Sequence, residues 1–193
     1  FLPNNKEPYI LAQNIYHPGL QNSDKLVKNN IELGRKNPKN LCITGPNASG
    51  KSVFMKTIIT NIILSQTLGI SFSDKFIITP FSFIDSIFNI SDNLGKESLF
   101  EAQIQRILNY INQINQINHL QSSSNNIRHF SFLVVDEILN STNVDIGLCV
   151  AYSILEYLIQ KKENIILSAT HYTTLSKLQD KYPKLIKNIM FDA

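Results

Sequence analysis

Residues 45–52, with the sequence GPNASGKS, restrict the possible folds of this chain more than any other feature. They have the form G-x-x-x-x-G-K-S, follow the apolar residues 41–43, and precede a predicted helix from Val53 to about Leu68. The two glycines let the backbone bend so that successive N–H groups point at one anion. The amino-terminal end of the helix directs its partial positive charge to the same place. This order of parts predicts a buried strand, a phosphate-binding loop and a helix.

The residue types in this loop suit a nucleoside triphosphate held together with Mg²⁺. The Lys51 ammonium can reach the β- and γ-phosphates, and the Ser52 hydroxyl can bind the metal. An ordinary glycine-containing turn is the alternative interpretation. We expect the nucleotide to be bound by the eight loop residues and the residue after them: Gly45, Pro46, Asn47, Ala48, Ser49, Gly50, Lys51, Ser52 and Val53.

A pair of carboxylates follows a second apolar run. Residues 132–135 are continuously apolar, as expected for a strand buried on both faces, and they end at Asp136 and Glu137. The carboxyl ends of parallel strands line the crevice in which ligands bind. We therefore expect Asp136 to reach Mg²⁺, directly or through water, and Glu137 to activate an attacking water as general base. Without the loop upstream, the same pair would be interpreted as a solvated turn.

A third predicted strand, residues 164–169, ends at Thr170, His171 and Tyr172. This order brings another polar side chain to the carboxyl edge of the sheet. His171 can sense the γ-phosphate through one hydrogen bond, which would make it a switch and not a base. The alternative is a helix-capping Thr170 followed by a partly buried histidine.

The composition favours one intracellular domain. The chain has 193 residues, of which 43% are hydrophobic, and its net charge of +3 is spread over scattered lysines that form no groove for a nucleic acid. Cys42 and Cys149 lie in apolar stretches and are predicted to be buried thiols in a reducing compartment. The sequence has no signal peptide and no apolar run that could cross a bilayer. We expect no membrane partner and a location in the cytoplasm, nucleus, nucleoid or a viral compartment.

The remaining segments complete an alternating pattern of helices and strands. Short strands are predicted at residues 9–12, 26–33, 77–78 and 83–90, helices at 97–120 and 144–161, a loop at 121–126, and one or two short helices after His171. This alternation predicts an α/β fold with a mostly parallel sheet flanked by helices. The long helix has apolar residues at steps of three and four, which predict one apolar face: Ile104, Ile107, Leu108, Ile111, Ile114 and Ile117.

With these motifs placed, the chain resembles the ATPase domain of the MutS family, the mismatch-repair ATPases of ABC type. Residues 45–52 resemble the Walker A motif of the family, although Ala48 and Ser49 stand where Met-Gly is common. Residues 136–138 match its Walker B motif, and residues 169–172 (ATHY) match its switch sequence. Residues 16–18 resemble the Arg-His-Pro that opens the domain, and residues 188–193 resemble a strand near its end. The resemblance implies one P-loop NTPase domain of ABC type over residues 1–193.

The resemblance also implies a fragment of a longer protein. The DNA-binding regions of the family and its carboxy-terminal helix-turn-helix dimerisation segment are absent from the sequence. The implied cofactors are ATP or ADP and Mg²⁺. The implied partners are a second ATPase domain, in a homo- or heterodimer, and DNA held by other domains of the parent protein.

Residues 91–101 resemble the signature segment of the family, which reaches across the dimer. The resemblance implies that Ser98 contacts, in trans, the γ-phosphate bound by the partner. A helix start favours such an anion through its free N–H groups and its dipole. The alternative is that Ser98 is only an N-cap, with Glu101 completing a capping box.

Two departures from the family pattern bear on function. After the Walker B motif the family commonly has Gly-Arg-Gly-Thr-Ser, whereas residues 139–143 here are LNSTN, with only Thr142 in register. The aromatic residue that stacks on adenine in the family falls at Leu26. Leu26 and Val27 are therefore expected to press on the base with weaker stacking.

The function expected from these motifs is ATP binding and hydrolysis coupled to conformational change of attached DNA-binding parts, through a composite dimeric site. Hydrolysis by the isolated fragment is expected to be slow, because half of each site comes from a partner. One alternative is a nucleotide-binding regulatory module with little hydrolysis. Another is a different ABC-type ATPase, such as an SMC-like one, although the chain lacks a Leu-Ser-Gly-Gly-Gln signature.

Overall fold

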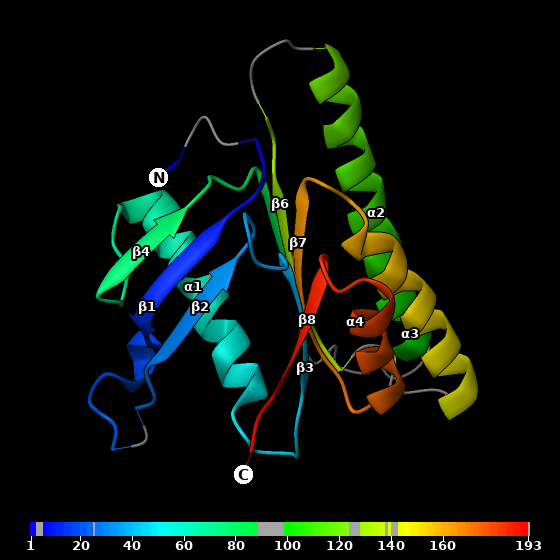
Figure 1. Ribbon diagram of the computed structural model, residues 1–193, viewed down its shortest axis with the longest axis horizontal. Helices are drawn as coiled ribbons and strands as arrows, with labels where there is room; N and C mark the ends of the chain where they lie inside the picture. Colours follow the sequence, from blue (N-terminus) through cyan, green and yellow to red (C-terminus); the bar gives the residue numbers. More distant parts are fainter. Residues whose placement is uncertain are drawn as a thin grey trace.

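The computed structural model describes residues 1–2, 6–24, 26–88, 99–123, 128–137, 139 and 143–192. Its main feature is a five-stranded sheet with the strand order β5-β6-β7-β3-β8 (Figure 1). Every neighbouring pair in this sheet is parallel. The strands are β3 (Asn40–Thr44), β5 (Phe83–Ile87), β6 (Ser131–Asp136), β7 (Asn164–Ala169) and β8 (Ile186–Met190).

A second, smaller sheet is antiparallel and has the order β2-β1-β4. Its strands are β1 (Ile10–Ile15), β2 (Asn29–Leu33) and β4 (Lys75–Ile78). The sequence pattern predicted short strands in these regions but not their pairing into a separate sheet. The predicted α/β fold with a mostly parallel sheet is confirmed, because every strand pair of the larger sheet is parallel.

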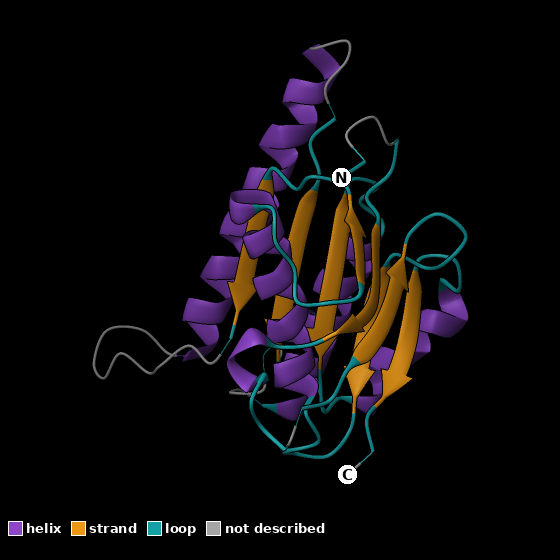
Figure 2. Ribbon diagram, turned by 90° about the vertical axis from the view of Figure 1, so that its left-hand side faces the viewer, coloured by secondary structure: helices purple, strands orange, loops and turns teal. Residues whose placement is uncertain are grey.

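The helices lie on both faces of the parallel sheet (Figures 1 and 2). Helix α1 (Lys51–Leu68) lies between the two sheets, and α2 (Leu99–Ser123), α3 (Val144–Ile159) and α4 (Lys177–Lys181) cover the opposite face. Two short 3-10 helices are η1 (Pro18–Leu20) and η2 (Thr173–Ser176). In the part of the chain that the structure describes, no helix combines the length and the apolar character needed to span a membrane.

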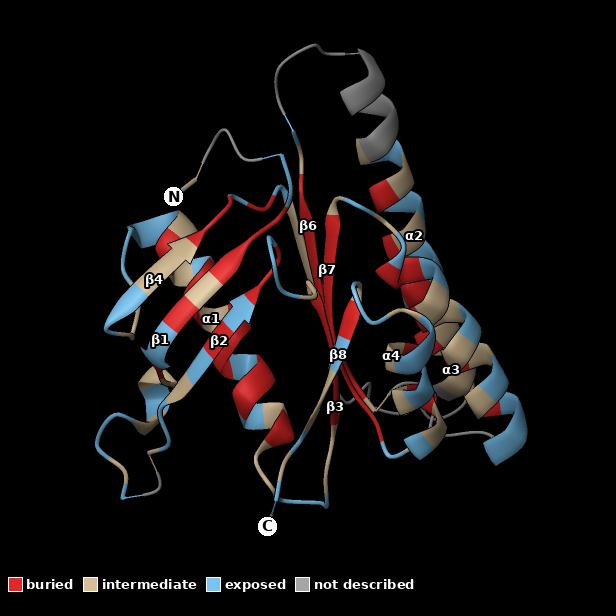
Figure 3. Ribbon diagram, in the orientation of Figure 1, coloured by how far each residue is buried: buried red, intermediate tan, exposed pale blue. Residues whose placement is uncertain are grey.

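Two apolar clusters hold these layers together. One joins α1 to the antiparallel sheet and to residues such as Ile43, Val134 and Leu167 on one face of the parallel sheet. The other joins α2, α3 and α4 to its second face. All six residues of β6 and all six of β7 are buried, as expected for strands covered on both sides (Figure 3). The continuous apolar runs in the sequence therefore correspond to the centre of the fold.

Several element boundaries differ from the sequence prediction. The strand predicted at 26–33 begins only at Asn29, because the Leu26 N–H donates to the Ser23 carbonyl in a turn. Helix α2 continues to Ser123, beyond the predicted start of a loop at residue 121. The strand predicted at 188–193 spans Ile186–Met190.

Two predictions about burial were wrong. Cys42 is buried as expected, but Cys149 is exposed, because it lies on the solvent side of α3, away from the buried Gly147 and Ala151. On α2, Leu108 is 46% exposed, whereas Ile107 and Ile114 are buried. The apolar face of α2 is therefore narrower than the pattern of steps suggested.

A buried asparagine fastens the amino-terminal edge of the parallel sheet. Asn40 begins β3 and is fully buried. Its side-chain amide donates to the Ile159 carbonyl at 3.3 Å and to the Leu185 carbonyl at 2.8 Å, and its oxygen accepts from the Ile166 N–H at 2.9 Å. One side chain therefore joins β3 to the end of α3, to β7 and to the start of β8.

Replacing Asn40 with alanine should lower the free energy of unfolding by about 3 kcal/mol, because the buried Ile159 carbonyl and Ile166 N–H and the partly buried Leu185 carbonyl each lose a hydrogen bond. The measurement is urea denaturation followed by circular dichroism. Asn112→Ala, on the exposed side of α2, is the matched control and should change stability by less than about 0.5 kcal/mol. Equal stability of the two variants would contradict this role of Asn40.

Candidate functional site

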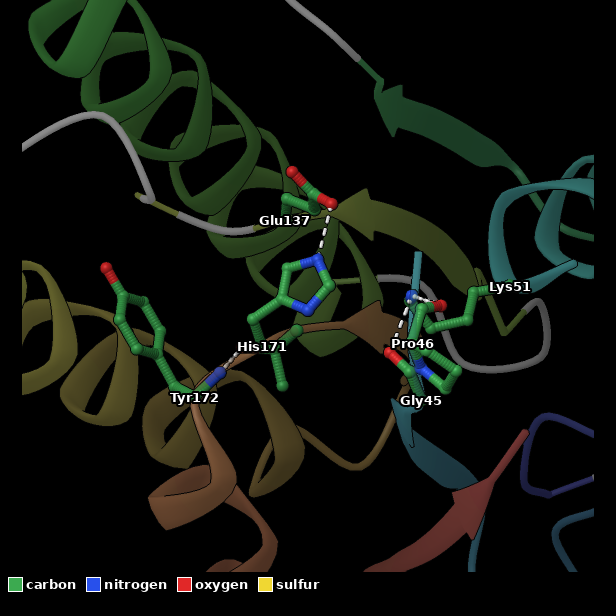
Figure 4. Close-up of polar contacts among 7 residues, drawn as sticks. Gly45, Pro46, Lys51, Glu137, His171 and Tyr172 are labelled. Carbon is green, nitrogen blue, oxygen red and sulfur yellow. Dashed lines mark hydrogen bonds and ion pairs between the residues drawn. The ribbon is translucent and has the colours of Figure 1, made fainter. Parts of the chain in front are cut away.

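Three strand ends meet at the carboxyl edge of the parallel sheet. β7 lies between β3 and β6, and Ala169 is in register with Ile43 on one side and Asp136 on the other. The main chain continues these links, because the Thr170 N–H donates to the Ile43 carbonyl and the Glu137 N–H donates to the Ala169 carbonyl, both at 3.0 Å. The glycine-rich loop, the carboxylate pair and His171 therefore lie at one edge, as the sequence predicted (Figure 4).

The glycine-rich loop has a backbone that glycine permits. Gly45 has φ +146°, and Gly50, the N-cap of α1, has φ +97°. A Cβ atom on Gly45 would lie 2.4 Å from the carbonyl oxygen of Phe191, which itself follows β8. The Phe191 N–H donates to the Thr44 carbonyl at 2.8 Å. The first glycine is therefore needed because the carboxy-terminal segment passes directly against the loop.

The positively charged ammonium of Lys51 lies against the backbone of the glycine-rich loop. It is the first residue of α1 and is 5% exposed. Its ammonium donates to the carbonyl oxygens of Gly45 at 2.9 Å and Pro46 at 2.8 Å (Figure 4). In addition, the Ser49 Oγ atom is buried and has no hydrogen-bond partner among the described residues. An anion beside Lys51 would meet a helix N-terminus and an ammonium, whereas Ser49 lies in the lining of a separate pocket described below.

The two carboxylates have different surroundings. Asp136, the last residue of β6, is 6% exposed. Glu137 has a left-handed backbone with φ +54°, and its Oε1 lies 2.8 Å from the Nε2 of His171, within hydrogen-bonding distance (Figure 4). The His171 side chain is 41% exposed. Thr170 is buried and its hydroxyl accepts a hydrogen bond from the Tyr172 N–H, but it does not cap a helix, because the N-cap of the following 3-10 helix is Tyr172.

A pocket of about 390 Å³ lies between the loop and the carboxylates. It contains the two predicted metal ligands, Ser52 and Asp136. Among the described residues, no group of three His, Cys, Asp or Glu side chains is placed to hold a metal. The Ser52 hydroxyl and the Asp136 carboxylate are oxygen groups of the kind that bind Mg²⁺. The lining residues are Asn47, Ala48, Gly50, Lys51, Ser52, Val53, Asp136 and Glu137.

A second pocket, of about 740 Å³, lies on the other side of the loop. It shares Ala48, Gly50 and Val53 with the first pocket. Of the two residues predicted to contact a base, Val27 lines this pocket, whereas Leu26 does not. The lining residues that were not predicted as part of a site are His17, Leu20, Asn29, Phe54, Thr57, Met190, Phe191 and Asp192.

The predicted signature residue Ser98 lies outside the described residues, as does Thr142. The long helix that follows Ser98 is described from Leu99 onward, with Glu101 in its first turn. The prediction of a contact in trans therefore stays a prediction.

Leu139, two residues after Glu137, is hydrogen-bonded to two distant side chains. Leu139 is fully buried; its N–H donates to the Gln103 Oε1 on α2 at 3.1 Å, and its carbonyl accepts from the Tyr172 hydroxyl at 2.9 Å. Burial raises the pKa of Tyr172, which keeps this hydroxyl protonated as a donor. Sequence reasoning missed Gln103, because its partner is 36 positions away along the chain.

These features define an α/β protein with a mostly parallel sheet that brings a glycine-rich loop and two carboxylates to one edge. The sequence matches the family model described as MutS domain V over residues 41–193. It is 32% identical over 171 residues to the DNA mismatch repair protein MSH3 of Scheffersomyces stipitis, which covers 88% of this chain and 15% of that protein. The chain belongs to the MutS family of DNA mismatch repair proteins, as its motifs predicted.

Bacterial relatives are similar to the same extent. The chain is 30% identical over 166 residues to the DNA mismatch repair protein MutS of Syntrophomonas wolfei and 33% identical over 166 residues to that of Finegoldia magna. Each match covers 84% of this chain and 18% of the relative. The chain thus spans less than a fifth of the length of the curated relatives it matches.

Replacing Gly45 with alanine should lower stability far more than the same change at Gly69, the C-cap of α1. Both glycines have positive φ, but a Cβ on Gly69 meets nothing within 4 Å, whereas one on Gly45 meets the Phe191 carbonyl. We expect a loss of about 1 kcal/mol for Gly69→Ala and at least twice that for Gly45→Ala. Thermal denaturation measures both, and similar melting temperatures would contradict the close approach of Phe191.

Proposed function

We propose that this chain is the ATP-binding and ATP-hydrolysing module of a MutS-family DNA mismatch repair protein, with a P-loop fold of ABC type. The observation that carries the proposal is the single pocket shared by Lys51, Ser52, Asp136 and Glu137. Such a pocket combines a positive cradle for phosphates with carboxylates for a metal and a water. Membership of the MutS family removes the alternative of an SMC-like ATPase.

The residues present fit a triphosphate. The backbone N–H groups of the loop, which every loop residue except Pro46 carries, and the N-terminus of α1 favour an anion. The Lys51 ammonium would leave the Gly45 and Pro46 carbonyls and donate to phosphate oxygens. This exchange keeps the buried ammonium hydrogen-bonded in both states.

Mg²⁺ would be held by the Ser52 hydroxyl and the Asp136 carboxylate, which line the same pocket. When bound, the ion supplies positive charge that neutralises the phosphate oxygens during transfer. Asp136 is almost fully buried, so its carboxylate keeps a fixed position at the end of β6.

Glu137 would act as the general base. Its carboxylate lies at the pocket and would accept a proton from the attacking water at Oε1 or Oε2. His171 Nε2, 2.8 Å from Glu137 Oε1, would orient this carboxylate and report on the γ-phosphate. The larger apolar pocket, with Val27 and Phe54 in its lining, suits the adenine base. Leu26 has no place in that lining, which leaves Val27 as the contact of the two.

The module would work in a dimer inside the cell. Ser98 of one copy would reach the γ-phosphate bound by the other, and DNA would be bound by other domains of the parent protein. The names of the relatives, DNA mismatch repair proteins MSH3 and MutS, support a role in DNA repair. ATP binding and hydrolysis would change the conformation of those DNA-binding parts.

A second candidate function is nucleotide binding with little hydrolysis. One observation favours it: residues 139–143 depart from the family pattern, and Leu139 stands where that pattern commonly has glycine. A changed sequence beside the proposed base would slow hydrolysis and leave nucleotide binding intact, so the module would act as a regulatory binding unit.

Replacing Lys51 with methionine should weaken Mg·ATP binding by at least about tenfold, because a charge-assisted hydrogen bond to phosphate is lost. Isothermal titration calorimetry on the chain measures the affinity. Lys56→Met, an exposed lysine on the same helix, is the control and should bind as the wild type does. Unchanged affinity in Lys51→Met would refute the placement of the phosphates.

Glu137→Gln separates the two candidate functions. In the full-length protein it should lower the rate of ATP hydrolysis by about 100-fold while nucleotide affinity stays within about twofold, because only the base is lost. Glu163→Gln is the matched control, because Glu163 lies just before β7, at the amino-terminal edge of the sheet and therefore at the edge opposite Glu137. A hydrolysis rate that Glu137→Gln leaves unchanged would favour the binding-only module.

A further inference from the structure

Glu137 and Leu139 both have an unfavourable backbone conformation. Glu137 has φ +54° and Leu139 has φ +55°, both in the left-handed region. Residues with a Cβ atom rarely adopt this region, and they persist there only where the surrounding structure fixes them. Contacts with other parts of the chain are therefore expected to hold Glu137 and Leu139 in place.

Leu139 is held by two side chains from other elements. Both of its peptide groups are buried, and neither is paired within a strand or helix: Gln103 accepts from its N–H and Tyr172 donates to its carbonyl. Gln103 is itself only 5% exposed, and the Leu139 side chain packs in the cluster formed by α2 and α3. Loss of either side chain would leave a buried polar group without a partner.

The same contacts close a ring around the proposed base. Tyr172 follows His171, whose Nε2 lies 2.8 Å from Glu137 Oε1, and Glu137 is two residues before Leu139. The carboxylate is thus reached from one side through His171 and from the other through the Leu139 backbone. Gln103 fastens this ring to α2.

We propose that Gln103 and Tyr172 are positioning residues that hold Leu139 in its left-handed conformation and thereby direct the Glu137 carboxylate into the pocket. This inference rests on the proposed ATP hydrolysis, because it concerns the geometry of the base. It assigns the two side chains a role in the chemical step without contact with the nucleotide. Replacing either side chain would lower kcat and leave the affinity for the nucleotide unchanged.

The variants Gln103→Met and Tyr172→Phe test the proposal in the full-length protein. Each removes one hydrogen bond to Leu139 and keeps most of the side-chain volume. Gln105→Met is the matched control, because Gln105 lies on the exposed side of the same helix. We expect each of the two variants to lower kcat by about tenfold or more, with the Kd for Mg·ATP within about twofold of the wild type.

The double variant should lose less in kcat than the product of the two single losses, because both side chains act on one residue. Hydrogen–deuterium exchange gives a readout that does not depend on catalysis. Peptides that contain Leu139 should exchange faster in Gln103→Met than in the wild type or in Gln105→Met, since the N–H loses its acceptor.

Two failures can be told apart. If the wild type neither binds nor hydrolyses ATP, the proposed function is wrong and this inference falls with it. If the wild type hydrolyses ATP and both variants keep its kcat, the hydrogen bonds only stabilise the fold and the inference alone is overturned. A lower melting temperature with unchanged kcat has the same meaning.

Discussion

The pairing of β7 with β3 on one side and β6 on the other is the constraint on which the site depends. Ala169 is in register with both Ile43 and Asp136, so the three strands end at the same level. Hydrogen bonds from Thr170 to Ile43 and from Glu137 to Ala169 continue this alignment into the loops. A shift of one residue in either pairing would turn side chains to the other face and separate the loop from the carboxylates.

The opposite edge of the sheet supports this register with buried polar groups. Asn40 joins β3, β7, α3 and the segment before β8. Asn164, at the start of β7, accepts hydrogen bonds from the hydroxyls of Tyr110 and Ser131. Such groups are costly to bury unless they are paired in one arrangement, and they therefore specify the strand alignment as well as stabilising it. Buried hydrogen bonds at the amino-terminal edge of the sheet thus help to align the strands at the carboxyl edge, which carries the proposed chemistry.

Much of the fold could be predicted because its signals are local. Residues 132–135 are a continuous apolar run, residues 164–169 are mainly apolar, and polar residues follow both; both became inner strands of the sheet with those polar residues at the expected edge. The glycine-rich loop was predicted because Gly45 and Gly50 permit backbone angles that other residues rarely adopt. The start of β2 was missed because a turn at Ser23 overrides the strand propensity of Leu26 and Val27.

The rest could not be predicted because it depends on contacts between distant parts of the chain. Nothing in the local pattern links Gln103 to Leu139 or places Phe191 against Gly45. The lining of the larger pocket likewise combines residues from both ends of the chain. Cys149 was predicted to be buried from an apolar neighbourhood, but only the packing of α3 decides which of its sides faces the sheet.

The central claim is that the glycine-rich loop before α1 binds a triphosphate opposite the carboxylates of Asp136 and Glu137. A crystal structure of the chain with Mg²⁺ and a non-hydrolysable ATP analogue tests this most directly. We predict phosphates against the N–H groups of residues 45–52, the Lys51 ammonium moved from the loop carbonyls to a phosphate oxygen, and the metal between Ser52 and Asp136. A nucleotide bound elsewhere, or a loop that keeps Lys51 on the Gly45 and Pro46 carbonyls with the nucleotide present, would contradict it.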